Sequence, residues 1–281
     1  MSRRMNQEVN ILTSELMPEK FTSNVPVMIK QDMGQRPRFF DWDPGQLREK
    51  IGDKLVLVDH SHDGLFRVDP DAATYEDKME KLPFNSFLDK ISHNPATRDY
   101  LYLIHSSIPG HYPELMKEID IPHYVDQERL RHINLWVGQA GNVSPLHFDT
   151  NNNVLCEIYG RKKIFIYPPN QMSLLYPYSC FSRAPYVSPV RVTEPDLDKH
   201  PKFSQAKPVE IILHPGDILY IPPFWWHQVY NLDLTISVNF WWSLYRHQCW
   251  QRSYARIVIY RLYNRCMDFL KRSVIPEQGS S

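Results

Sequence analysis

The chain has 281 residues, of which 42% are hydrophobic and 13% aromatic, so it can bury a substantial core and is expected to be globular. Its 32 basic and 32 acidic residues cancel, which argues against non-specific binding to nucleic acid, although a specific contact with nucleic acid is not excluded. No signal-like or membrane-spanning apolar run occurs and the four cysteines are scattered, so we expect an intracellular protein, cytoplasmic or nuclear, without a membrane partner.

The first hundred residues have a mixed pattern. Residues 25–30 (VPVMIK) and 54–59 (KLVLVD) are rich in β-branched and aliphatic residues and predict strands. Residues 42–52 have Asp43-Pro44 near their start and predict a helix, and residues 82–91 have apolar residues at helical spacing. We therefore expect residues 1–100 to flank a core rather than to fold alone.

A different pattern begins at Ile133, where short apolar runs alternate with turn residues. These runs predict six strands with no helical periods between them: INLWVG, NVLCEIYG, KKIFIYPP, VEIILHPG, DILYIPP and LTISVNFWW. The pattern favours a mainly β fold, an antiparallel sandwich or barrel with a jelly roll as the best match, over residues 101–243. Residues 244–281 predict a C-terminal helical segment in which Ile257, Leu262 and Phe269 alternate with arginines, a pattern typical of packing or homodimer contact.

The stretch SPLHFDTNNNVLCEIYGRKK, residues 144–163, contains a His-x-Asp pair that is a weak signal by itself. If extended structure continues through the segment, His147, Asp149, Asn153 and Leu155 share one face, because side chains alternate along a strand. After a turn at Gly160 the chain is expected to return antiparallel and to point Lys162 into the same interior. A buried lysine requires an anion.

A second histidine, His227, follows the apolar strand of GDILYIPPFWWHQV, and Trp225 and Trp226 beside it can wall a dry cavity. Two imidazoles and one carboxylate form the ligand set of non-haem Fe(II) oxygenases, which leaves three coordination positions open. An anionic co-substrate could chelate the ion there while O2 takes the remaining position.

These segments together resemble one family. INLWVGQAGNVSPLHFD, NNNVLCEIYGRKKIFIYPPNQ and HPGDILYIPPFWWHQV through LTISVNFWW are similar to the JmjC-domain oxygenases that depend on Fe(II) and 2-oxoglutarate. Within them the chain most resembles the small hydroxylase branch, which includes the asparaginyl hydroxylase acting on hypoxia-inducible factor and its arginyl-hydroxylase relatives. The resemblance implies a double-stranded β-helix, a cupin-like jelly roll, with Fe(II), 2-oxoglutarate and O2 as cofactor and co-substrates.

The resemblance also implies roles for individual residues. His147, Asp149 and His227 would ligate iron, and Lys162 would pair with the distal carboxylate of 2-oxoglutarate. The further positions implied near the co-substrate are Ser144 and Tyr102, which would bond the same carboxylate, the amides Asn153 and Asn239, and Trp136. Glu157 departs from the family, because relatives often have glutamine there; the sequence offers no account of this carboxylate beyond a substrate contact.

The function implied is a dioxygenase that hydroxylates a protein or peptide side chain and releases succinate and CO2. Demethylation of methyl-lysine, or hydroxylation of RNA or a small molecule, is the alternative, since the same chemistry acts on whichever atom the pocket presents. A non-oxygenase cupin that binds a metal is a further alternative, and so is a catalytically silent interaction protein. Lys162 argues against the cupin alternative and the complete ligand set against the silent one.

A second group of metal-ligand side chains occurs in DHSHDG, residues 59–64. Its Asp-Gly ending is typical of a turn, so the sequence predicts a solvated loop rather than a metal site.

Overall fold

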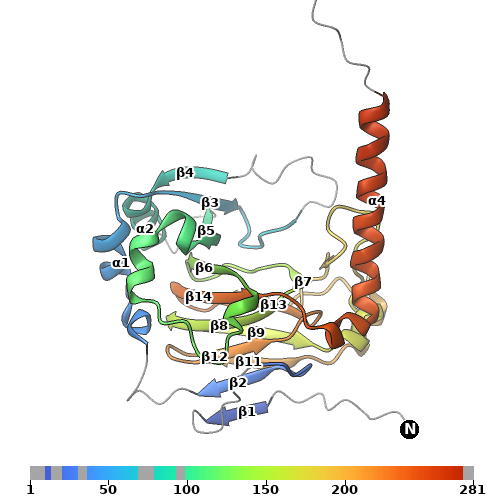
Figure 1. Ribbon diagram of the computed structural model, residues 1–281, viewed down its shortest axis with the longest axis horizontal. Coiled ribbons are helices and arrows are strands. Elements are labelled where there is room, and N and C mark those ends of the chain that lie inside the picture. Colours follow the sequence, from blue (N-terminus) through green and yellow to red (C-terminus); the bar gives the residue numbers. More distant parts are fainter. Residues whose placement is uncertain (1–9, 14–20, 31–36, 69–78, 93–98, 275–281) are drawn as a thin grey trace, which may run out of the picture.

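The computed structural model describes residues 10–13, 21–30, 37–68, 79–92 and 99–274 (Figure 1). The polar N-terminal stretch and the last seven residues lie outside the described residues. The strands are β1 (Asn10–Thr13), β2 (Val27–Lys30), β3 (Leu55–Ser61), β4 (Met79–Pro83), β5 (Tyr100–Ser107), β6 (Leu130–Gly138), β7 (Leu146–Phe148), β8 (Asn152–Tyr159), β9 (Lys162–Tyr167), β10 (Val187–Ser188), β11 (Val209–Leu213), β12 (Ile218–Ile221), β13 (Trp226–Asn231) and β14 (Thr235–Trp242). The α-helices are α1 (Pro44–Ile51), α2 (Phe84–Ser92), α3 (Ile108–His111) and α4 (Arg252–Val274). The 3-10 turns are η2 (Arg38–Asp41), η4 (Pro113–Glu118), η5 (Gln127–Arg129), η6 (Pro169–Leu174), η7 (Pro201–Gln205) and η8 (Arg246–Trp250).

Two sheets form the body of the molecule. The larger has the order β1-β2-β12-β8-β14-β6-β5-β3-β4 and the smaller the order β10-β7-β13-β9-β11. Apart from the parallel pair β1 and β2, all strand pairs are antiparallel. This confirms the expected mainly β, jelly-roll fold with a C-terminal helix.

The N-terminal elements extend the larger sheet on both sides. Strand β2 pairs with β12 on one side, and on the other side β3 pairs with β5 and β4 with β3, so the first hundred residues contribute strands to the same sheet as the core (Figure 1). Helix α1 begins after Asp43, whose side chain accepts a hydrogen bond of 2.8 Å from the amide of Gln46, and Pro44 fits the first helical position. Helix α1 and helix α2 both lie where the sequence predicted helices.

Helix α2 covers one face of the larger sheet. Phe84, Phe87, Leu88 and Ile91 are spaced to lie on one side of the helix, and all four are buried in a core shared with the sheet. The inner face of the sheet packs against the smaller sheet through a second apolar cluster, which includes Leu155 of β8, Ile221 of β12 and Ile164 of β9. A third cluster, which contains Trp226, joins the smaller sheet to η7 and α4. The central strands are consequently buried on both faces, and β8 is buried along its whole length except for Tyr159.

The structure corrects two expectations about residues 144–163. The chain bends between Phe148 and Asn152, so β7 belongs to the smaller sheet and β8 to the larger one, and no single strand face carries all the predicted residues. The turn at Gly160, whose φ is +73°, does not close a hairpin either. It sends the chain from β8 across to β9 in the smaller sheet, so the two strands face each other as layers instead of pairing.

The C-terminal helix α4 begins at Arg252, later than the predicted segment, because residues 246–250 form the separate turn η8. Its first turns are anchored: Ile257 is buried, and Arg256 donates a hydrogen bond of 2.7 Å to the carbonyl of Pro185. Further along, Ile259 and Leu262 are exposed, and the helix stands away from the sheets (Figure 1). In the described part of the chain, no helix combines the length and apolar character that crossing a membrane requires.

Candidate metal centre and co-substrate cavity

Strand pairing brings the two predicted histidine ligands together. His147 on β7 lies directly opposite His227 on β13, and their ring centroids are 4.2 Å apart. Opposed residues of an antiparallel pair point to the same side of a sheet, here toward the larger sheet. Asp149, two residues after His147, lies between them: its two carboxylate oxygens are 3.8 Å from Nε2 of His147 and 3.8 Å from Nε2 of His227.

Both histidines are held by the same backbone contact. Nδ1 of His147 donates to the carbonyl of Pro145 at 2.8 Å, and Nδ1 of His227 donates to the carbonyl of Trp225 at 3.0 Å. A carbonyl can only accept, so these bonds place the proton on Nδ1 and leave the Nε2 lone pair facing Asp149. This is the tautomer that a metal ligand needs.

Burial prepares His227 for the same role. The side chain is almost fully buried, and desolvation together with repulsion from His147 lowers its pKa to about 4. His227 is therefore neutral at physiological pH, as a metal ligand must be. The carboxylate of Asp149 is oriented by Asn153, whose Nδ2 donates to Oδ2 at 3.3 Å.

One cavity between the sheets is lined by all nine residues to which the resemblance gave a role at the metal or the co-substrate. Trp225 and Trp226, which were expected to wall it, do not line it, and neither does Glu157. Its walls come from both sheets and include the apolar side chains of Leu155 on β8 and Ile221 on β12. The full lining is Tyr102, Trp136, Ser144, His147, Asp149, Asn153, Leu155, Lys162, Ile221, His227, Val229, Asn239 and Trp241. The side chains of His147 and Asp149 are 20% and 14% exposed to solvent, whereas Lys162 is 1% exposed. The cavity thus reaches solvent at the histidine end and is closed at the lysine end.

The lysine end contains an ion pair that the sequence did not predict. Nζ of Lys162 lies 3.5 Å from Oε2 of Glu157, and it also hydrogen-bonds to the hydroxyl of Ser237. Ser237 in turn donates to Oε2 of Glu157 at 2.9 Å. Glu157 and Ser237 meet because β8 and β14 are paired and place these two residues opposite each other.

Burial sets the ionisation of this pair. Desolvation raises the pKa of Glu157 to about 7, although Lys162 and Ser237 oppose that shift and Asp217 adds to it. Desolvation also lowers the pKa of Lys162, against the attraction of Glu157. In the described residues Oε1 of Glu157 has no hydrogen-bond partner, so one oxygen of this carboxyl group is available to carry a proton.

The remaining predicted residues surround the middle of the cavity. Tyr102 is buried, and desolvation with the nearby Glu157 raises its pKa, so the phenol stays protonated and can donate to a carboxylate. Asn239 accepts a hydrogen bond of 3.1 Å from Asn134 through Oδ1. Ser144, just before β7, lines the same cavity as Trp136.

Sequence reasoning missed one aromatic neighbour of the site, His105. His105 has a φ of +48° in an irregular part of β5, and its ring lies 4.4 Å from that of Trp136 and 5.1 Å from that of Trp241. Left-handed backbone outside glycine is uncommon and is enriched at functional sites. Strand alternation in the sequence places Trp241 on the same face as Ser237 and Asn239, but no local pattern marks His105.

The donor set fits a ferrous ion. Two imidazole Nε2 atoms and a carboxylate, all within 4.8 Å of one another, form a group that could hold a metal. Buried polar atoms around the cavity also lack partners among the described residues, namely Nε1 of Trp136, Nε1 of Trp241 and Oδ1 of Asn153. Such atoms are expected where a polar ligand or water completes the bonding.

Comparison with known proteins agrees with this architecture. The family described as "Cupin-like domain" matches residues 13–246. The chain is 30% identical over 249 residues to "Lysine-specific demethylase JMJ30" of Arabidopsis thaliana, covering 86% of this chain and 55% of that protein. It is 44% identical over 147 residues to "Lysine-specific demethylase 8" of Xenopus tropicalis, covering 50% and 33%, and 31% identical over 245 residues to "JmjC domain-containing protein D" of Dictyostelium discoideum, covering 80% and 53%.

The chain spans between about a third and a little over half of the length of these curated relatives. The matched part is the domain that carries the cavity.

Proposed function

The chain belongs to the cupin-like domain family and, within it, to the JmjC proteins, and from this premise we propose that it is an Fe(II)- and 2-oxoglutarate-dependent oxygenase. In the reaction, one atom of O2 enters succinate as 2-oxoglutarate loses CO2, and the other enters a C–H bond of the substrate. The bound ion would supply the site for chelating 2-oxoglutarate and activating O2.

One observation carries the proposal. The Nε2 atoms of His147 and His227 converge with the Asp149 carboxylate at the open end of a cavity whose closed end holds the buried ammonium of Lys162. A dicarboxylate suits both ends: its 2-oxo acid group would face the metal ligands and its distal carboxylate the lysine. The cation at the closed end also distinguishes this proposal from a cupin that only binds a metal.

The chain's own residues would bind the co-substrate and exclude water. Tyr102 and Ser144 line the cavity and can donate hydrogen bonds to the distal carboxylate beside Lys162. The fully buried Trp226 seals the smaller sheet behind the histidines. A dry, pre-arranged cavity strengthens each of these polar contacts and limits side reactions with water.

We further propose that the substrate is a cationic side chain of a protein or peptide, namely methyl-lysine, and that the reaction removes its methyl group. The names of the relatives support demethylation above the side-chain hydroxylation expected from the sequence. Trp136 and Trp241 line the cavity, and His105 packs against both, so an aromatic wall stands beside the ligands. Aromatic faces attract methylated ammonium groups through cation–π interactions. A hydroxylated N-methyl group loses formaldehyde, which leaves the demethylated lysine.

Anaerobic titration of the protein with Fe(II) and 2-oxoglutarate tests the oxygenase proposal. We expect a weak visible charge-transfer band at one equivalent of each, followed by succinate release when air is admitted. His147→Ala should lose both signals, whereas His123→Ala, which changes an exposed histidine on another part of the surface, should keep them. A folded, iron-loaded wild-type protein that gives neither signal contradicts the proposal.

The fate of the substrate is tested separately with peptides. Methyl-lysine and arginine peptides are incubated with the active protein, and products are followed by mass spectrometry and a formaldehyde assay. Loss of a methyl group with equimolar formaldehyde supports demethylation. Gain of one oxygen atom without formaldehyde would instead establish hydroxylation.

A further inference from the structure

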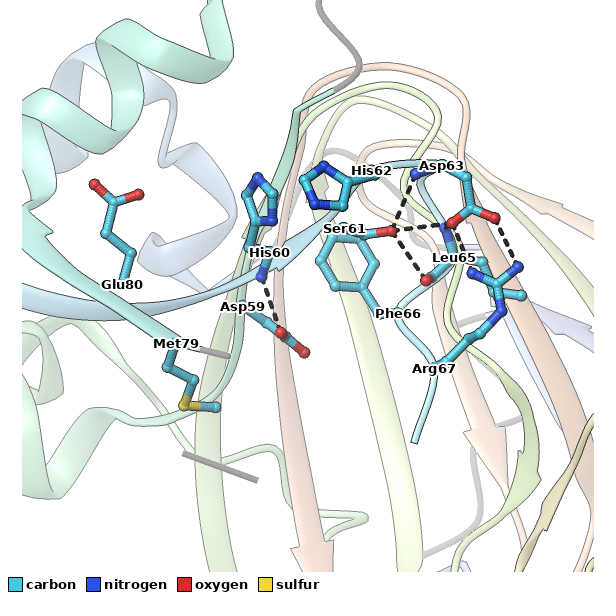
Figure 2. A pocket seen from close by; sticks show the side chains of 10 residues that line it. All are labelled: Asp59, His60, Ser61, His62, Asp63, Leu65, Phe66, Arg67, Met79 and Glu80. Carbon is cyan, nitrogen blue, oxygen red and sulfur yellow. Dashed lines mark hydrogen bonds and ion pairs between the residues drawn. The ribbon is translucent and has the colours of Figure 1, made fainter. Parts of the chain in front are cut away.

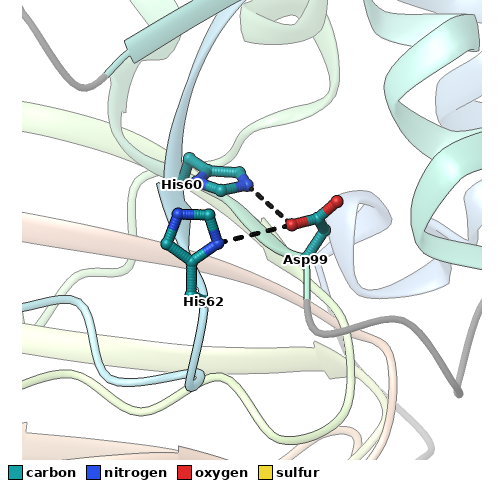
Figure 3. A group of neighbouring side chains, drawn as sticks. All are labelled: His60, His62 and Asp99. Atoms are coloured by element: carbon teal, nitrogen blue, oxygen red, sulfur yellow. Dashed lines mark hydrogen bonds and ion pairs between the residues drawn. The ribbon is translucent and has the colours of Figure 1, made fainter.

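A second cluster of metal-ligand side chains lies at the end of β3, away from the cavity. His60 and His62 are two residues apart, so they leave the strand on the same side. Ser61 pairs with Tyr100 on β5, which brings Asp99, the residue before β5, opposite His62. Figure 3 shows both rings directed at the same oxygen of Asp99. The prediction of a solvated loop at residues 59–64 is therefore wrong for residues 59–61, because β3 continues through Ser61.

The distances within this cluster match those between ligands of one small ion. Oδ1 of Asp99 is 3.2 Å from Nε2 of His60 and 3.5 Å from Nδ1 of His62, and the three ligand atoms lie within 4.8 Å of one another. Two ligands bound at about 2.0–2.1 Å to a tetrahedral zinc ion are about 3.3–3.4 Å apart. The two rings are inclined by 81°, so their nitrogen lone pairs can approach one point from different directions.

The neighbouring charged groups are engaged elsewhere, which leaves Asp99 as the carboxylate of the cluster. His60 and His62 line a groove along β3 together with Asp63, Arg67 and Glu80 (Figure 2), and its volume is about 600 Å³. In it Asp63 accepts hydrogen bonds of 2.8 and 2.6 Å from Arg67, which lowers the pKa of Asp63 to about 2. Glu80 forms an ion pair of 2.6 Å with Lys90.

The ligand atoms are also accessible to an ion from solvent. The side chain of His62 is 83% exposed, that of Asp99 65% and that of His60 31%. Within the described residues, the ion-pair partners of Asp99 are these two histidines, so no lysine or arginine competes for its carboxylate.

We propose that His60, His62 and Asp99 form a surface site for a zinc-type transition-metal ion, with water completing the coordination. Two imidazoles with one carboxylate are a ligand set that zinc accepts, and an open position is normal when three protein ligands are present. An ion bound there would join the end of β3 to the start of β5, two strands that share three register pairs. It would therefore stabilise this part of the sheet, by an amount that grows with the logarithm of the zinc concentration once the site is mostly occupied.

Zinc binding can be measured independently of the cavity site. The double variant His147→Ala/Asp149→Ala removes two of the three ligands there, and its zinc stoichiometry is then measured by competition with a chromophoric chelator. We expect one equivalent of Zn²⁺ to bind, and the unfolding temperature to rise with zinc. Adding His62→Ala or Asp99→Asn should abolish both effects, while adding the control His123→Ala should leave both unchanged.

Either of two results would overturn the site. One is that the double variant, folded by circular dichroism, binds no zinc; the other is that binding survives His62→Ala and Asp99→Asn. Neither result bears on the oxygenase proposal, which is tested with iron in the protein that retains His147 and Asp149.

Discussion

Replacing Glu157 with glutamine should change how co-substrate binding depends on pH. The cavity holds one buried ammonium, that of Lys162, and Glu157 is already 3.5 Å from it. If the distal carboxylate of 2-oxoglutarate binds the same ammonium, two carboxylates share one cation, and like-charge repulsion favours the protonated form of Glu157. Binding should then take up a proton.

The size of the effect follows from the pKa of about 7 that burial gives Glu157. If only the protonated form is competent, about 90% of the protein is competent at pH 6 and about 10% at pH 8, so the apparent Kd rises about tenfold between them. Glutamine has nearly the same shape and cannot ionise, and its amide can still bond Ser237 and face Lys162. The Glu157→Gln variant should therefore bind 2-oxoglutarate with an affinity that is flat over this range.

Isothermal titration calorimetry of 2-oxoglutarate into Mn(II)-loaded protein provides the assay, since Mn(II) occupies the ligands without turnover. Repeating it at pH 8 in buffers of different ionisation enthalpy should give an uptake of about 0.9 proton per 2-oxoglutarate for the wild type and none for the variant. Protonation of the ligand His227, whose pKa is about 4, would weaken metal binding only well below pH 6 and with the opposite slope. A wild-type affinity that is constant from pH 6 to 8, or an equal slope in the variant, would refute the reasoning.

Three further predictions concern other parts of the molecule. Lys162→Ala should raise the 2-oxoglutarate concentration needed for succinate release much more than it lowers the maximal rate, and an unchanged requirement in steady-state assays would remove Lys162 from the proposed role. Gly160→Ala should destabilise the fold by about 1 kcal/mol or more in urea unfolding, because φ is +73° and a Cβ would clash with the carbonyl of Leu234; unaltered stability would contradict this. The exposed Leu262 on α4 predicts a homodimer. Light scattering should detect the dimer in the wild type and a weaker dimer in Leu262→Glu. A wild-type protein that is monomeric at high concentration would exclude the dimer.

The sequence allowed much of the architecture to be predicted, because strands and amphipathic helices have local patterns. Helix α2 illustrates this, since its buried residues follow the spacing that the sequence displays. The connection at Gly160 was predicted wrongly, because its path depends on more than the local pattern. A glycine with positive φ predicts a turn, but whether the turn closes a hairpin or crosses to a second sheet depends on packing that the local sequence does not encode.

The same distinction separates the parts of the site that could be predicted from those that could not. The ligand types and spacing of His147 and Asp149 are local, whereas Glu157 became interpretable only when β14 placed Ser237 beside it, 80 residues further along the chain. In the same way DHSHDG gave two imidazoles but not the carboxylate, because Asp99 reaches His60 across 39 residues through the pairing of β3 with β5. In both places a side chain from a distant strand changes the chemistry: Ser237 hydrogen-bonds to Glu157 and opposes the rise in pKa that burial causes, and Asp99 turns a histidine pair into a ligand set. The pH dependence of co-substrate binding and the zinc stoichiometry therefore test the strand pairing itself as well as the residues.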